Sequence, residues 1–189
     1  MNHVLLILSS VLLSPEVDSP ALALGFDPCA EGAIVDSRQA AAYLKHAAAR
    51  SDKVQVETIG LSTEGRPILC AAVSAPENLR RLEEIREKRD KVFALVTCGV
   101  HPAEVGSTPA ALLLLHRLVT ERIPRAREVL SEVVIFVIPC FNPDGTDRVS
   151  GWLRGGRKDG GEGAPHALPF PQHRFAGHDL NRDWMLGTQ

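Results

Sequence analysis

The stretch "VFALVTC", residues 92–98, is an uninterrupted run of apolar and β-branched side chains. A second run of the same kind, "VVIFVIPC", occupies residues 133–140. Neither run alternates apolar with polar residues, as a strand with one solvated face would. Both are therefore typical of strands that are covered on both faces. We predict that Phe93–Thr97 and Val134–Ile138 form neighbouring buried strands.

Helical and extended segments surround these two runs. Residues 37–50, "SRQAAAYLKHAAAR", are rich in alanine, so a helix capped by Asp36 or Ser37 is expected. In chain order we then expect strands at 54–60 and 67–74, a helix over 76–91 opened by Pro76, the strand at 92–98, a helix at 108–120 capped by Thr108, and the strand at 133–140. This order predicts an α/β domain with a mixed β-sheet flanked by helices, its last two strands parallel.

Residues 141–189 follow a different pattern. They are rich in Gly, Pro, Arg and Asp and show little periodicity. A structureless stretch of this length is uncommon inside a compact domain. We therefore expect a functional surface here, in a domain that is C-terminally incomplete.

The composition is that of one globular domain. The chain has 189 residues and a net charge of −2, with 23% charged and 44% apolar residues. This balance lacks the basic footprint of a nucleic-acid-binding protein. The four cysteines form no CxxC pair, so a thiolate zinc knot is not expected. Buried free thiols are predicted, with a disulfide between Cys98 and Cys140 as the alternative.

Residues 1–23 have two features of a secretory signal peptide. Val4–Leu13 is an apolar core too short to span a bilayer as a helix, and "ALA" at 21–23 is a small-x-small cleavage sequence. We expect a mature chain that begins near Leu24 and is secreted or periplasmic. Because no Lys or Arg precedes Arg38, the alternatives are a buried or disordered N-terminus or a misplaced start.

Polar side chains follow the ends of both apolar runs. His101 and Glu104 come directly after the first, and "NPDG", residues 142–145, follows the second. Ligands of open α/β sheets bind outside the carboxyl ends of the strands, so both loops should meet at one edge. Imidazole nitrogen and carboxylate oxygen are good zinc ligands, and a spacing of three places them on one side of a turn. The spacing also fits an ordinary polar loop.

Arginines lie further along the chain. "GHDLNRDW", residues 177–184, contains Asn181 and Arg182, and Arg154 precedes it in "GWLRGG". A guanidinium grips a carboxylate with two parallel hydrogen bonds. One arginine near a metal could stabilise an oxyanion while another holds a substrate carboxylate.

The motifs "GLSTEGRPI", "HPAE", "NPDG" and "DLNRDW" occur in the order seen in zinc carboxypeptidases. Over residues 35–189 the chain resembles the M14 (carboxypeptidase A-like) metallopeptidase family. The resemblance implies a zinc-dependent exopeptidase fold and the N-terminal part of its catalytic domain. It also implies hydrolysis of C-terminal peptide bonds by zinc-activated water, with a peptide or protein C-terminus as substrate. No membrane span is expected, because the one N-terminal apolar run is too short.

The resemblance assigns roles to individual residues. His101 and Glu104 match the first two zinc ligands, and Asn181 and Arg182 match the pair that binds the substrate's terminal carboxylate. Arg154 matches the catalytic arginine that polarises the scissile carbonyl, with the nearby Arg148 and Arg157 as alternatives. Asp144 and Asp179 are expected to shape loops.

The family's third zinc ligand, a histidine, and its general-base glutamate lie downstream of the "LNR" motif. They have no matching positions here, because His166, His173 and His178 come before that motif. We therefore expect the 189-residue chain alone to bind zinc weakly and to be inactive. The alternatives are a same-fold amide hydrolase like the aspartoacylase group and a non-catalytic remnant that binds carboxylates.

Overall fold

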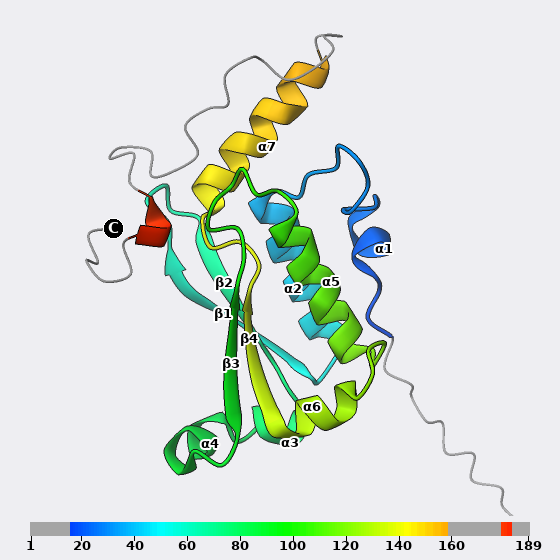
Figure 1. Cartoon of the computed structure of the whole chain (residues 1–189), viewed down its shortest axis with the longest axis vertical. Helices are drawn as coiled ribbons and strands as arrows, with labels where there is room; N and C mark the ends of the chain where they lie inside the picture. Colours follow the sequence, from blue (N-terminus) through cyan, green and yellow to red (C-terminus); the bar gives the residue numbers. More distant parts are fainter. Residues whose placement is uncertain (1–15, 159–178, 183–189) are drawn as a thin grey trace, which may run out of the picture.

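The computed structural model describes residues 16–158 and 179–182, with four strands and helices around them (Figure 1). The strands are β1 Val54–Leu61, β2 Pro67–Val73, β3 Val92–Thr97 and β4 Val133–Ile138. The helices are α1 Pro20–Leu24, α2 Ser37–Arg50, α3 Pro76–Leu79, α4 Leu82–Lys88, α5 Ser107–Val119, α6 Ala126–Glu132, α7 Pro143–Lys158 and the 3₁₀ helix η1 Leu180–Arg182.

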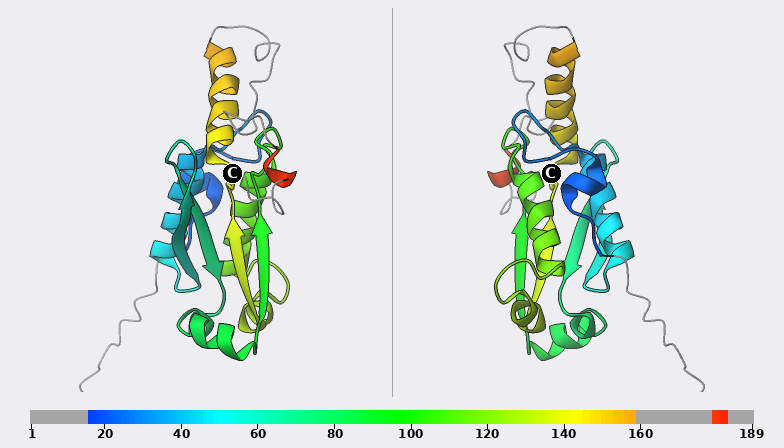
Figure 2. Two further views of the ribbon diagram at one scale, coloured as in Figure 1. Left: turned by 90° about the vertical axis from the view of Figure 1, so that its left-hand side faces the viewer. Right: turned by 90° about the vertical axis from the view of Figure 1, so that its right-hand side faces the viewer.

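The strands form one mixed sheet in the order β1-β2-β4-β3. β2 is antiparallel to β1 and to β4, whereas β3 and β4 are parallel and in register from Val92 opposite Val133 to Thr97 opposite Ile138. The mixed sheet and the parallel pairing of the two apolar runs are therefore confirmed. Helices α2 and α5 lie side by side over one face of the sheet (Figures 1 and 2).

The hydrophobic core lies between the sheet and these two helices. Leu44 of α2, Leu112 and Leu115 of α5 and Val137 of β4 are fully buried in it. The prediction that β3 is buried was wrong for the described part of the chain, because Val92, Phe93 and Leu95 are exposed. Side chains alternate along a strand, so Ala94 and Val96 pack against the core while Phe93 and Leu95 lie on the opposite face of this edge strand.

Local signals account for most element boundaries. The predicted helix at 37–50 is confirmed, and Asp36 caps it in a reciprocal capping box with Gln39. The predicted helix after Pro76 is split into α3 and α4. The split occurs at Arg81, whose backbone leaves the helical region at φ −121°.

Polar contacts also define the starts of α5 and α7. Thr108 does not cap α5, because Gly106 takes the cap position and Thr108 Oγ1 donates to Pro139 O at 2.8 Å. The "NPDG" sequence forms the start of α7: Asn142 Oδ1 accepts the Gly145 N–H at 2.9 Å, and Pro143 is the first helical residue.

The four cysteines are free, as predicted, but only Cys140 is buried as expected: Cys70 and Cys98 are half-buried and Cys29 is exposed. In the parts of the chain that the structure describes, no helix is long and apolar enough to cross a membrane.

Candidate active site

The loops that follow β3 and β4 are joined by their backbones at the carboxyl edge of the sheet. Phe141 N–H donates to Cys98 O, and Asn142 N–H donates to Gly99 O, both at 2.9 Å. Gly99 has φ +66°, and a Cβ there would lie 3.1 Å from Cys140 Cα. Only glycine adopts this backbone at such a close approach without strain. These two backbone hydrogen bonds fix where the chain enters the loop that carries His101.

His101 and Glu104 face each other in that loop. His101 Nδ1 lies 3.1 Å from Glu104 Oε1, and the Glu104 N–H donates to His101 O at 2.9 Å. Ser107 closes the loop, because its hydroxyl donates to Glu104 O and accepts the Gly99 N–H. The imidazole is 27% exposed and the carboxylate 68% exposed, so both are open to an incoming ligand.

Asp179 contacts the other nitrogen of His101. His101 Nε2 lies 2.9 Å from Asp179 Oδ1, which also accepts the Asn181 N–H. Hydrogen bonds to Asp179 and then to Glu104 raise the pKa of His101, and the pKa of Asp179 is lowered by its bond to His101. Asp179 therefore shapes its loop, as expected, and also orients His101, which the sequence did not predict.

Asn181 and Arg182 lie on η1, directly after Asp179, and both are exposed. Arg182 Nη1 donates to Asn181 O at 3.3 Å. The contact between Asp179 and His101 therefore brings η1 beside the loop after β3 (Figure 1). Four of the five predicted site residues, His101, Glu104, Asn181 and Arg182, lie in this region.

Arg154 contacts the start of α2. Its guanidinium donates to Asp36 Oδ2 at 2.7 Å, to Gln39 Oε1 at 3.0 Å and to Ile34 O at 3.3 Å. Burial works to raise the pKa of Asp36, but the hydrogen bonds from Arg154 and from Gln39 N–H outweigh it and leave the pKa lowered. Of the two alternatives, Arg148 Nη2 lies 3.6 Å from Glu64 Oε1, and the side chain of Arg157 lies outside the described residues.

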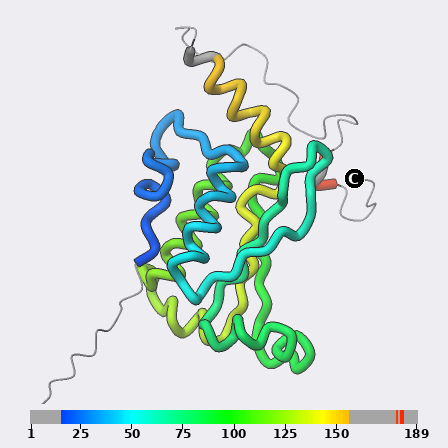
Figure 3. The backbone as a smooth tube through the Cα atoms, turned by 180° about the vertical axis from the view of Figure 1, so that it is seen from behind, coloured from blue at the N-terminus to red at the C-terminus, as the bar shows by residue number. Residues whose placement is uncertain are grey.

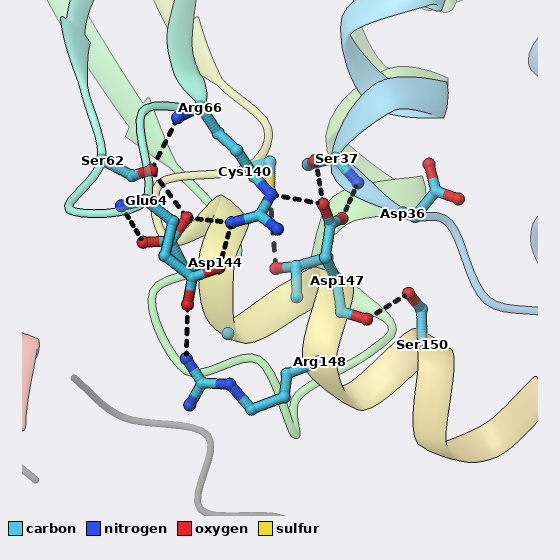
Figure 4. A network of polar contacts seen from close by, with 12 residues as sticks. Asp36, Ser37, Ser62, Glu64, Arg66, Cys140, Asp144, Asp147, Arg148 and Ser150 are labelled. Atoms are coloured by element: carbon cyan, nitrogen blue, oxygen red, sulfur yellow. Dashed lines mark hydrogen bonds and ion pairs between the residues drawn. The ribbon is translucent and has the colours of Figure 1, made fainter. Parts of the chain in front are cut away.

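The "STEGRP" and "NPDG" motifs meet in a polar cluster around Arg66 (Figure 4). Arg66 Nη1 donates to Glu64 Oε2 at 2.6 Å and to Asp144 Oδ1 at 2.7 Å, and its Nε lies 2.8 Å from Asp147 Oδ2. Asp147 in turn accepts from the N–H and hydroxyl of Ser37. The Arg66 cluster thus fastens the start of α7 to the β1–β2 turn and to α2, which confirms the loop-shaping role expected of Asp144.

Comparison with known proteins identifies the family of this chain. The sequence profile of the peptidase M14 family, described as zinc carboxypeptidase, matches residues 40–188. The chain belongs to the zinc carboxypeptidase family. No curated protein sequence was found that matches the chain.

Solved carboxypeptidase structures share the fold. The metallo-carboxypeptidase from Burkholderia cenocepacia is 22% identical with a TM-score of 0.55, over 81% of this chain and 34% of that one. The carboxypeptidase A from Helicoverpa armigera is also 22% identical with a TM-score of 0.54, over 70% of this chain and 32% of that one. The chain thus spans about a third of the length of these carboxypeptidases.

The zinc that this family uses fits the facing pair. An imidazole nitrogen and a carboxylate oxygen converge in the loop after β3, and a second carboxylate holds the far side of the imidazole. Within residues 16–158 and 179–182, no group of three or more His, Cys, Asp and Glu side chains is placed to hold a metal ion. The histidines at 166, 173 and 178 lie outside the described residues.

Proposed function

We propose that this chain provides the zinc-binding edge of a metallocarboxypeptidase that hydrolyses C-terminal peptide bonds. The observation that supports it most is the facing pair of His101 Nδ1 and Glu104 Oε1 with Asp179 behind the imidazole. The family profile over residues 40–188 favours this peptidase over an aspartoacylase-like amide hydrolase.

His101 and Glu104 would hold the metal. A bound zinc ion supplies a Lewis acid that polarises a carbonyl and lowers the pKa of water. With zinc bound, Asp179 would accept a hydrogen bond from His101 Nε2–H and so leave the lone pair of Nδ1 for the metal. The two donors are thereby held ready on the exposed side of the loop.

Asn181 and Arg182 would bind the terminal carboxylate of the substrate. The guanidinium of Arg182 is a planar fork that matches a carboxylate, and its side chain is exposed. Arg154 would stabilise the oxyanion that develops on the scissile carbonyl. To do so its guanidinium must exchange Asp36 and Gln39 for the substrate, since these side chains bind it in this structure.

Metal titration of the 189-residue chain tests the ligand assignment. Zinc affinity is measured by competition with a chromogenic chelator for the wild type, His101→Ala, Glu104→Ala and Asp179→Ala. Each ligand variant should lose at least about 10-fold in affinity, and Asp179→Ala about 10–100-fold. Asp90→Ala removes an exposed carboxylate whose one partner among the described residues is Arg81, so it should leave the zinc affinity unchanged. Equal zinc affinity in all five proteins, or none in any, would contradict the assignment.

Peptide binding tests the carboxylate assignment separately. A peptide with a free C-terminus should bind more tightly than its C-terminal amide, and Arg182→Ala should remove that preference. Arg86→Ala is the matched control, because Arg86 is an exposed arginine paired only with Glu83 in the described structure. A preference that survives in Arg182→Ala would show that Arg182 does not read the carboxylate.

A further inference from the structure

Residues 16–24, here called the N-terminal segment, pack into the domain. Val17 is 5% exposed and belongs to the main hydrophobic core, and Pro20 is buried. Helix α1 within the segment has its own caps, since Ser19 Oγ accepts the Leu22 N–H and Gly25 ends the helix at φ +77°. In Figure 3 the segment, in dark blue, runs beside α2.

Polar contacts fasten the same segment to α2. The hydroxyl of Tyr43 donates to Asp18 O at 3.0 Å, and Tyr43 itself is 1% exposed. His46 Nε2 lies 3.2 Å from Asp18 Oδ2. On the other side, Arg122 after α5 donates to Glu16 Oε1 at 2.9 Å. The segment therefore bridges α2 and the end of α5 through both apolar and polar contacts.

A signal-peptidase cut after Ala23 would remove all of these contacts. It would take Val17 out of the core and leave the buried hydroxyl of Tyr43 without its acceptor, and a buried polar group without a partner is costly. The apolar run Val4–Leu13, by contrast, ends before Glu16. A leader could be removed ahead of Glu16 without disturbing any packed residue that the structure describes.

We infer that any export cut in this chain falls N-terminal to Glu16, and that the mature protein keeps residues 16–24 as a permanent part of the domain. The small-x-small sequence at 21–23 is then a stretch of α1 and not the processing site. This inference does not depend on zinc binding or on peptidase activity.

The N-terminus of the exported protein tests the inference directly. The full chain is produced with its own N-terminus in a Gram-negative host, and the soluble protein of the periplasm and of the cytoplasm is analysed by intact mass and N-terminal sequencing. The first residue should be Glu16 or an earlier one in each fraction, Met1 included. A folded protein that begins at Leu24 would overturn the inference.

Point variants of the full chain test whether the segment is part of the fold. Val17→Ala and Tyr43→Phe should each lower the thermal midpoint by about 2–8 °C, because each removes a buried contact. Leu22→Ala, in the same N-terminal segment as Val17 but at a side chain that is 69% exposed, should change the thermal midpoint by less than about 1 °C. If Val17→Ala leaves the midpoint as unchanged as Leu22→Ala does, the segment is not part of the core and the inference fails.

Discussion

Replacing Arg66 with methionine tests whether the Arg66 cluster holds α7 against the sheet. The substitution keeps most of the apolar stem but leaves Glu64, Asp144 and Asp147 without the cation they share. Hydrogen bonds to charged groups contribute about 1.5–3 kcal/mol each. Here the three contacts share one guanidinium that is 33% exposed, so screening and non-additivity reduce their sum.

We expect Arg66→Met to lower the free energy of unfolding by about 2–4 kcal/mol, which is about 4–16 °C in the thermal midpoint for a domain of this size. Circular dichroism during thermal and urea unfolding at neutral pH measures both quantities. Arg81→Met is the matched control: Arg81 also contacts two carboxylates, Glu84 and Asp90, but is 41% exposed. Its loss should stay within about 0–1 kcal/mol.

The pH dependence of the Arg66 effect has a definite sign. Burial works to raise the pKa of Asp144, but hydrogen bonds from Ser62 and Arg66 outweigh it and leave the pKa below 3.8. A carboxyl with a lowered pKa in the folded state stabilises the protein above its unfolded-state pKa, and the stabilisation is lost as pH falls through the folded-state value. The difference in the free energy of unfolding between the wild type and Arg66→Met should therefore become smaller below pH 3.8. Equal losses in Arg66→Met and Arg81→Met at neutral pH, or no narrowing in acid, would refute the reasoning.

Three further predictions concern the close backbone approach at Gly99, the cap of α2 and the thiols. Gly99→Ala should lower the thermal midpoint and weaken zinc binding together, because a Cβ at φ +66° would lie 3.1 Å from Cys140 Cα; unfolding scans and the chelator assay measure both. Asp36→Ala should cost about 1–3 kcal/mol in urea unfolding, because it removes both the α2 cap and an acceptor of Arg154, and an unchanged unfolding midpoint would contradict this. Cys29 should react with a thiol reagent in the native protein well before Cys140, because burial raises the pKa of the Cys140 thiol to about 12. The reaction is followed by absorbance, and equal rates for the two thiols would contradict the burial of Cys140.

Strands β3 and β4 and helix α2 could be predicted because their signals are local. A short apolar run rich in β-branched residues favours a strand, and Asp36 followed by Gln39 marks the start of α2. The parallel pairing of β3 and β4 followed from the helix between them. The candidate ligands His101 and Glu104 could be placed at the sheet edge for the same reason, since they directly follow a strand end.

Helix α7 could not be predicted in this way. Its sequence contains four glycines, at 145, 151, 155 and 156, and each interior glycine costs about 1 kcal/mol relative to alanine. The described contacts that favour the helix come from distant parts of the chain: Arg66 and Ser37 bind its first turns, and Asp36 binds Arg154. Tertiary contacts therefore outweigh local propensity, and no pattern within residues 143–158 reveals them.

The role of Asp179 shows the same limit at the candidate site. It lies 78 positions after His101, and nothing in "GHDLNRDW" marks this aspartate rather than Asp183 as the partner of an imidazole. In the structure the partner is Asp179, whose Oδ1 contacts His101 Nε2 and also accepts the N–H of Asn181. One carboxylate thus orients the candidate ligand and starts η1. The proposed substrate-binding pair therefore follows directly on the side chain that contacts His101 Nε2. A substitution at Asp179 should affect zinc and carboxylate binding together, whereas Arg182→Ala should affect carboxylate binding alone.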